Sequence, residues 1–255
     1  MKNSQEYSKK ISKFYRDSKK KYGKIPVIEY SDPVDALIYA AFSEKMGLRE
    51  SEDILKIFKK HFVDWNEFRV SRSEEICEIA GLSIMEGKVL AGSICRTLYS
   101  VFDKYNKVSL ADLLELGKRQ AKQDLEGLSG VTDFMVSYVF LTSLKGHAIP
   151  LTMGMVDYLK ANELVDPQSD HKDIAGFLER QISTSNAYEF YSYLRSEGEE
   201  PVKKTAKKVV AKTSSQSAKA KSSKSSVKTA EAKKTSKKKS VVKKKTAEKK
   251  VSKSK

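Results

Sequence analysis

The residues best placed to do chemistry in this chain form a glycine-punctuated turn, with the sequence LEGLSGVT at 125–132. A helix is predicted to end near Gln123, and a new apolar helix to begin at about Thr132. Glycine lets a backbone turn tightly and approach a phosphate, which the free N–H groups at the start of the next helix can bind. An ordinary turn is the simpler interpretation. The residues expected to face a phosphate are Gly127, Leu128, Ser129, Gly130 and Thr132.

A second candidate for phosphate binding is the segment 201–255, which holds 21 lysines, no arginine and two acids. Its net charge is +19, whereas residues 1–200 carry 28 Lys and Arg against 31 Asp and Glu. It has no aromatic residue and no Gly, so it cannot bury enough apolar surface to offset the entropy of ordering it, and we expect disorder. A flexible polycation binds polyanions, most often nucleic acid, although a solubility tail is the alternative. The lysines expected to contact phosphate are Lys203, Lys204, Lys207, Lys208, Lys237, Lys238, Lys239, Lys243, Lys244 and Lys245.

Composition narrows the class of protein. Residues 1–200 are long enough for one larger domain or two small ones with a real core. No run of about 18 apolar residues predicts a membrane span, and no apolar stretch after the basic N-terminus predicts a secretory signal. Cys77 and Cys95 are too few for a disulfide framework or a Cys-based metal site, and we interpret both as buried core residues. The three histidines are scattered, so no metal site is expected.

The apolar spacing predicts an all-α fold of short helices joined by short connections. The first 24 residues hold nine Lys and Arg against two acids, which indicates a basic amphipathic helix that Gly23 ends. An extended segment follows, and Ser31-Asp32-Pro33 is typical of a helix start. Further helices are expected around Ile54–Phe62, over Ser73–Ile79, over the buried stretch Val89–Phe102 and from Ser109 onward. Gly81 is expected to end the second of these helices. The loop after the first is expected to be anchored in the core by Trp65, Phe68 and Val70.

Five segments, taken in order, resemble the endonuclease III family of helix-hairpin-helix DNA glycosylases. SDPVDALIYAAFSEK is similar to the family's first barrel helix, IAGLSIMEGKVLAGSI to its GxYxxKAxxI step, and LEGLSGVT to the hairpin LPGVGxxTA. IPLTMGMVDYLKANELV matches IPVDTHVxRVxxRLGLV without a gap, and YLRSEGEE resembles the start of the last helix. The resemblance implies an endonuclease III-like fold over 1–200, with a barrel lobe at about 32–135, a second lobe from 1–31 plus 136–200, and the tail at 201–255.

The resemblance breaks down where the family carries its chemistry. The lysine nucleophile of bifunctional members aligns with Val131, and the aspartate of the VDTH motif aligns with Thr152. Valine has no nucleophilic atom, and a neutral hydroxyl offers no formal charge against a cationic sugar. The four cysteines of the family's iron–sulfur loop are also absent, and the lysine tail begins in their place. The resemblance therefore implies a degenerate member with neither glycosylase chemistry nor an iron–sulfur cofactor.

Other family positions differ as well, and some charged residues nearby need an interpretation. The family's His, Lys and Gln positions align with Gly154, Glu86 and the neighbourhood of Lys45. Asp133 and Asp157 are possible replacement bases, but an acid in a first helical turn and a solvated acid are the simpler interpretations. On the helix before the hairpin, three cations are candidate phosphate contacts or an ordinary solvated face: Lys118, Arg119 and Lys122.

The sequence thus predicts a non-enzymatic, largely sequence-nonspecific binder of double-stranded DNA, acting in DNA repair or in nucleoid or chromatin organisation. We expect a cytoplasmic or nucleoid-associated protein (nuclear in a eukaryote), with other repair or chromatin proteins as further partners and no membrane. Two alternatives stay open: an active glycosylase or abasic-site lyase with a displaced catalytic group, and a protein-binding scaffold. The pocket between the hairpin and the Ile149–Met155 loop discriminates between them. A carboxylate pointing into an open pocket there favours the enzyme, whereas an apolar plug formed by Val131, Leu151, Met153 and Met155 favours the pseudoenzyme.

Overall fold

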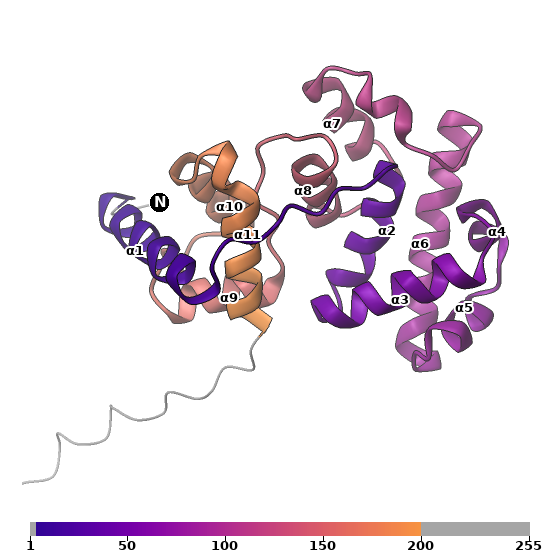
Figure 1. The fold of residues 1–255 in the computed structure, drawn as a ribbon, viewed down its shortest axis with the longest axis horizontal. Coiled ribbons are helices and arrows are strands. Elements are labelled where there is room, and N and C mark those ends of the chain that lie inside the picture. Colours follow the sequence, from indigo (N-terminus) through magenta and orange to yellow (C-terminus); the bar gives the residue numbers. More distant parts are fainter. Residues whose placement is uncertain (1–3, 200–255) are drawn as a thin grey trace, which may run out of the picture. The chain divides into compact units, whose positions relative to one another are not determined.

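The computed structural model describes residues 4–199, and within that range the chain is helical with no strand (Figure 1). The first half contains α1 (Ser4–Tyr22), α2 (Pro33–Ser43), α3 (Leu48–His61), α4 (Trp65–Val70), α5 (Ser73–Ala80) and α6 (Ile84–Tyr105). The second half contains the 3-10 helix η1 (Ala111–Leu114), α7 (Lys118–Glu126), α8 (Asp133–Thr142), α9 (Met153–Ala161), α10 (His171–Gln181) and α11 (Thr184–Glu199). The predicted all-α class is confirmed, and the lysine tail lies outside the described residues.

Helix α2 lies at the centre of the fold and is buried along its whole length. It packs against α3 and α6 on one side and against α8 on the other. The predicted helix start is confirmed, because Asp32 caps α2 by accepting a hydrogen bond from the Val34 N–H at 2.9 Å. The same carboxylate also accepts bonds from the Ser109 hydroxyl and the Leu110 N–H, so it joins the start of α2 to the chain ahead of η1.

Helix α1 packs on α10 and α11 through its apolar face, and Figure 1 shows these helices side by side with α9. Ile11 is fully buried, and Phe14 stacks edge-on against Phe190 with 5.9 Å between ring centroids. The helix ends where predicted, at Gly23, whose φ of 70° is readily adopted by glycine alone. The basic amphipathic helix is therefore a fixed part of the globular domain.

A half-buried carboxylate on α11 anchors α1. Glu189 accepts hydrogen bonds from the Tyr15 hydroxyl at 2.5 Å and from Lys19 Nζ at 2.9 Å. Burial alone would raise the pKa of Glu189, but the hydrogen bonds from Tyr15, Lys19 and Tyr193 outweigh it and lower the pKa. Burial, reinforced by the bond to Glu189, raises the pKa of Tyr15 to about 12. Both shifts favour the ionised carboxylate with a neutral phenol.

We expect Glu189→Gln to destabilise the domain by about 1 kcal/mol near neutral pH, because charge-assisted hydrogen bonds are replaced by neutral ones. Since the folded-state pKa of Glu189 is lowered, its contribution is present above the unfolded value and is lost as the pH falls through the folded one. Urea unfolding of both proteins from neutral to acidic pH checks this. A difference that persists undiminished in acid would contradict the assignment.

Four details of the predicted elements are wrong. Trp65–Val70 is a short helix rather than a loop, and Val70 is exposed although Phe68 is buried. Val89 lies on the exposed side of α6 instead of in the core. The segment after Ser109 forms only the short 3-10 helix η1, because the Asp32 carboxylate binds the Leu110 N–H and Gly117 follows soon after.

Cys77 and Cys95 are buried, as predicted, and are not bonded to each other. The division into two lobes stays a prediction.

Candidate nucleic-acid interface

The hairpin turn is shaped by one glycine in the left-handed region. Gly130 has a φ of 83°, and a Cβ there would lie 2.7 Å from the Thr97 hydroxyl oxygen on α6. Conformation and close approach both require glycine at this position. Ser129 is not among the positive-φ residues, so the serine that replaces a family glycine introduces no backbone strain. The expected turn is confirmed, with Thr132 as the cap of α8 through the Met135 N–H at 3.2 Å.

The N–H groups of the turn are partly used inside the protein. The Ser129 N–H donates to the Ser100 hydroxyl on α6 at 3.0 Å, and the Leu128 N–H donates to the Leu125 carbonyl. Leu128 itself is buried, whereas Gly127, Ser129 and Gly130 are exposed. Within residues 4–199, the Gly130 N–H makes no hydrogen bond. The turn therefore offers fewer donors for a phosphate than its sequence indicates.

The three cations predicted to contact phosphate from the preceding helix differ in how far their side chains are engaged in contacts within the protein. Lys118 donates to the Lys145 carbonyl at 2.5 Å, which ties α7 to the loop after α8. Lys122 lies over the Phe140 ring at 5.7 Å and within 3.9 Å of Glu126. Arg119 is exposed. The three belong to one helix, but we expect Arg119 to be the most available for a phosphate.

Asp133 and Asp157, the two possible replacement bases, are both exposed. Asp133 lies in the first turn of α8, and its carboxylate is 3.8 Å from Lys172 Nζ of α10. An exposed carboxylate at a helix N-terminus with a cation beside it matches the simpler interpretation of this residue. Neither aspartate lines the groove described below.

The two positions aligned with the family's catalytic groups have structural roles. Thr152 is buried and caps α9, because its hydroxyl accepts the Met155 N–H at 3.3 Å. Val131 is half-buried and packs against the hydrophobic core. Of the four residues of the possible apolar plug, Leu151 and Met155 are buried in the core. Met153 is 68% exposed at the first position of α9, so it does not contribute to such a plug.

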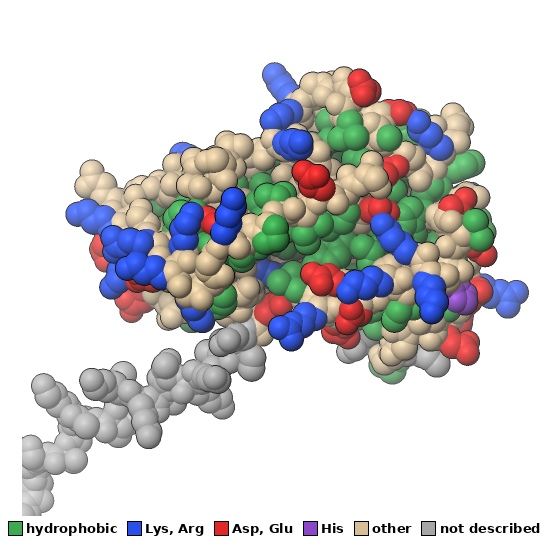
Figure 2. Space-filling model, viewed as in Figure 1, with side chains coloured by type: hydrophobic (Ala, Val, Ile, Leu, Met, Phe, Trp, Pro, Cys, Tyr) green, Lys and Arg blue, Asp and Glu red, His purple; other side chains and the backbone are tan. Residues whose placement is uncertain are grey.

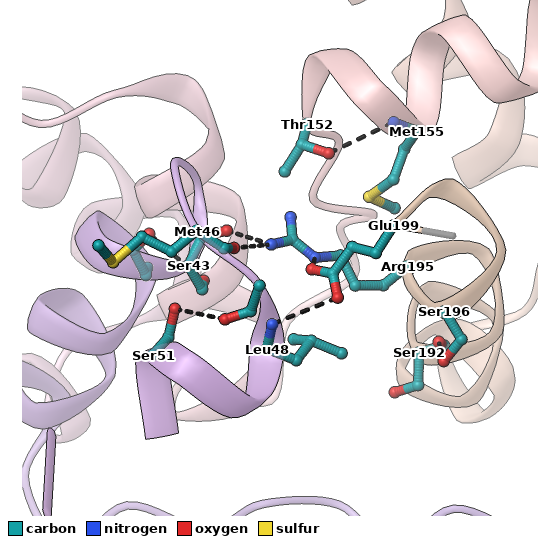
Figure 3. Close-up of polar contacts among 12 residues, drawn as sticks. Ser43, Met46, Leu48, Ser51, Thr152, Met155, Ser192, Arg195, Ser196 and Glu199 are labelled. Carbon is teal, nitrogen blue, oxygen red and sulfur yellow. Dashed lines mark hydrogen bonds and ion pairs between the residues drawn. The ribbon is translucent and has the colours of Figure 1, made fainter. Parts of the chain in front are cut away.

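A buried arginine beside Thr152 was missed by the sequence analysis. Arg195 of α11 donates through Nη2 to the carbonyls of Ser43 and Met46, the latter at 2.9 Å, and through Nε to Glu199 (Figure 3). The second oxygen of Glu199 accepts the Leu48 N–H at 3.2 Å. The arginine thus binds carbonyls at the C-terminal end of α2, and the glutamate binds the first N–H of α3. We call Arg195 and Glu199 the α11 clasp.

Both charges of the α11 clasp lie where helix dipoles favour them. Carbonyl groups at a helix C-terminus carry partial negative charge, and N–H groups at an N-terminus carry partial positive charge. Arg195 is only 2% exposed, so its charge depends on these partners. The clasp therefore fixes the α2–α3 turn, which holds Lys45, against the last helix of the domain.

The first turn of α9 lies against the same end of α11. A Cβ on Gly154 would be 3.2 Å from the Gly198 carbonyl oxygen, and one on Gly198 would be 3.1 Å from Met155 Cα. This close approach explains why glycine occupies the position of the family's histidine. Thr152 caps the helix at this contact, so the aspartate position of the family is adjacent to the clasp (Figure 3).

An open groove of about 760 Å³ lies between the α2–α3 turn, the start of α6 and the hairpin. Its walls are mainly apolar, and neither Val131 nor Thr152 lines it. Two carboxylates do, those of Glu44 and Glu50. Glu44 accepts the Thr132 hydroxyl at 2.8 Å and is 3.5 Å from Lys45 Nζ. The sequence analysis missed Glu44, because nothing local distinguishes an acid at the end of α2 from a solvated one.

Solved structures with a similar arrangement of helices include an endonuclease III and two glycosylases. A non-covalent endonuclease III–DNA complex matches with a TM-score of 0.60 and 15% identity, covering 74% of this chain and 84% of that one. The 8-oxoguanine glycosylase/lyase of Clostridium acetobutylicum in complex with double-stranded DNA matches with a TM-score of 0.58 and 14% identity, covering 76% of this chain and 69% of that one. The chain has the endonuclease III-like fold. A thermostable thymine-DNA glycosylase also matches, with a TM-score of 0.52 and 14% identity, covering 77% of this chain and 86% of that one. No protein-family model matches the sequence, and neither does any curated protein.

On this endonuclease III-like fold, the hairpin, Glu44 and Lys45 meet at the groove, whereas Val131 and Thr152 lie outside its lining. The lysines of the tail fall outside the described residues. No group of three or more His, Cys, Asp or Glu in the described part of the chain could hold a metal ion. None of the helices in that part is both long and apolar enough to cross a membrane.

Proposed function

We propose that this protein binds double-stranded DNA with little sequence preference and without catalysis, on an endonuclease III-like fold. The observation that carries the proposal is the state of the two catalytic positions: the Thr152 hydroxyl caps α9, and Val131 packs against the core. Neither side chain can act as an amine nucleophile or a charged base. The biological role would lie in DNA repair or in nucleoid or chromatin organisation. The protein would accordingly be cytoplasmic or nucleoid-associated, or nuclear in a eukaryote.

Two further observations support DNA as the partner. Solved structures of similar fold include an endonuclease III and a glycosylase/lyase bound to DNA, although this likeness at 14–15% identity concerns the fold. The 21 lysines of 201–255 supply the positive charge that residues 1–200 lack. Contacts between lysine and phosphate carry no base information, so binding would be alike on all sequences.

The proposal includes no iron–sulfur cluster. Such clusters are held by four cysteine thiolates, and this chain has two cysteines, both buried on different helices. Burial raises the pKa of the Cys95 thiol to about 11, which disfavours the thiolate form that binds metals. The donor set therefore does not fit the cofactor of the family that the sequence resembles.

One observation favours a second candidate, an active glycosylase or abasic-site lyase with a displaced group. Glu44 is an acid that lines an open groove beside the start of α8, although this groove has no wall from the 149–155 loop. Against this, the Glu44 carboxylate already accepts the Thr132 hydroxyl and lies near Lys45. A structural link between the α2–α3 turn and α8 accounts for both contacts.

We expect no base release and no strand cleavage on uracil-containing, oxidised-pyrimidine or abasic duplexes. Product analysis, with borohydride trapping of any Schiff base, is the measurement. Val131→Lys combined with Thr152→Asp is the informative companion, because aspartate also caps helices well and keeps the α9 start intact. A trapped adduct from this double variant alone would place position 131 within reach of the sugar, because borohydride traps only the bond between the lysine amine and the sugar.

Turnover by the unmodified protein would contradict the non-enzymatic proposal, provided that one carboxylate variant abolishes it. Glu44→Gln is the first variant to examine, since it keeps the hydrogen bond from Thr132 while removing the charge. Asp133→Asn and Asp157→Asn test the two acids singled out from the sequence. Glu50→Gln tests the other acid of the groove, and turnover that survives all four changes would point to a contaminating enzyme.

A further inference from the structure

The cations of α1 fall into two sets with different environments. Three of them are paired with acids: Lys10 with Glu6 at 2.9 Å, Lys19 with Glu189 at 2.9 Å, and Lys21 with Glu197 at 2.8 Å. The last two pairs join α1 to α11. The hydrogen bonds to Glu197 and Tyr22 raise the pKa of Lys21 and outweigh the opposing effect of burial. Lys19 and Lys21 therefore hold the helix on the domain, whereas Lys10 is paired within the helix.

The second set forms a line along the outer side of the same helix. Its members are exposed and follow one another at spacings of four, three and four residues. At 100° per residue they fall within an arc of about 60°, opposite the buried Ile11 and Ser18, and extend over roughly 16 Å. We call this set the α1 stripe; it consists of Lys9, Lys13, Arg16 and Lys20.

The stripe is nearly free of acids. Within the described part of the chain, its one ion-pair contact joins Arg16 Nε to Asp17 at 4.0 Å, and Glu6 nearby is taken up by Lys10. Figure 2 shows Lys and Arg side chains gathered over this end of the domain. Like charges three and four residues apart destabilise a helix by a few tenths of a kcal/mol per pair, and a bound polyanion relieves that repulsion.

We infer that the α1 stripe is a third contact surface for nucleic acid, distinct from the tail and the hairpin, and that it binds the phosphates of a duplex along about 16 Å. A duplex carries one charge per about 1.7 Å of its axis, so several phosphates lie within reach of four side chains over that length. Exposed Lys and Arg make such contacts without reading bases. The inference rests on the proposed DNA binding and adds the surface on the folded domain that provides it.

A lipid surface is the less favoured partner. Amphipathic helices that bind membranes bury their apolar face among the acyl chains. In α1 that face is already occupied, because Ile11 is fully buried and Phe14 and Tyr15 pack on Phe190. The exposed residues of α1 are charged or polar, and cations without a free apolar face match a polyanion in solution.

The test is made in the full chain with two variants of equal charge. The stripe variant replaces Lys9, Lys13, Arg16 and Lys20 by Gln. The control replaces by Gln four exposed cations that lie apart from one another on the domain. They are Lys56 and Lys60 of α3, Arg72 just before α5, and Arg180 near the end of α10. Binding to two unrelated duplexes over a salt series is measured, and circular dichroism with urea unfolding shows that both variants fold.

If each stripe residue neutralises one phosphate, the slope of log K against log salt becomes shallower by about 3–4 in the stripe variant. Affinity at low salt should fall at least about tenfold on both duplexes. The control should change the slope by less than about 1. Equal slopes in the two variants would overturn the inference while leaving DNA binding by the protein intact.

Two other outcomes have distinct meanings. If the unmodified chain does not bind duplex at any salt concentration, the proposed function fails together with the inference. Vesicles of phosphatidylserine and phosphatidylcholine are the second probe. Binding to these vesicles that is lost in the stripe variant, with DNA binding unchanged in it, would overturn nucleic acid as the partner of this surface.

Discussion

Deletion of residues 201–255 is expected to remove most of the affinity for duplex DNA. The segment carries a net +19, whereas residues 25–200, without the basic first helix, hold 19 Lys and Arg against 29 acids. If about ten of the lysines engage phosphates, log K falls against log salt with a slope of roughly −9. The truncated protein should show a slope near that of the α1 stripe alone, and an affinity lower by several powers of ten at low salt.

The measurement is binding of the full-length and truncated proteins to two unrelated duplexes over a salt series. Affinity should fall alike on both, because lysine–phosphate contacts carry no base information. A tail of unchanged length with every lysine replaced by glutamine is the matched control, and it should behave like the deletion if charge is the agent. Unchanged affinity and slope after truncation would exclude the tail as the binding element.

The elements of the fold were predictable because their signals are local. Helix caps at Asp32 and Thr132, and stops at Gly23 and Gly81, depend on residues within a few positions along the chain. The wrong predictions also arose from relying on local signals. Val89 fits the helical period of α6 but lies on its open side, and only the packing of neighbouring helices decides which apolar residues are covered.

The candidate site was predicted less completely, because its polar contacts join distant parts of the chain. Alignment with a resembling family predicts that Val131 and Thr152 stand where that family has its lysine and aspartate, yet it does not predict their structural roles. Glu44 meets Thr132 across 88 positions, and Arg195 meets Ser43 across 152. From sequence alone, Arg195 and Glu199 look like an ordinary exposed pair four residues apart. The burial of Arg195 depends on how α11 packs on α8 and α9, which brings it to the turn after α2.

Replacing Arg195 by Ala is expected to destabilise the domain by about 3–5 kcal/mol, since removal of one partner from a buried charged contact leaves the others unpaired. The carbonyls of Ser43 and Met46 lose their donor, and Glu199 loses its cation. Such a loss is a large share of the stability of a typical domain. Urea unfolding followed by circular dichroism measures it, with Arg180→Ala of α10 as an exposed control that should stay within about 0.5 kcal/mol.

Two further substitutions separate charge from geometry in the clasp. Arg195→Lys keeps the charge but lacks the planar fork that binds two carbonyls and a carboxylate together, so it should recover only part of the loss. Glu199→Gln keeps an acceptor for the Leu48 N–H and should cost about 1 kcal/mol. If Arg195→Ala cost no more than Arg180→Ala, the clasp would not hold the α2–α3 turn. Lys45 and the groove beside the hairpin would then be positioned by the apolar packing of α2 against α8 alone.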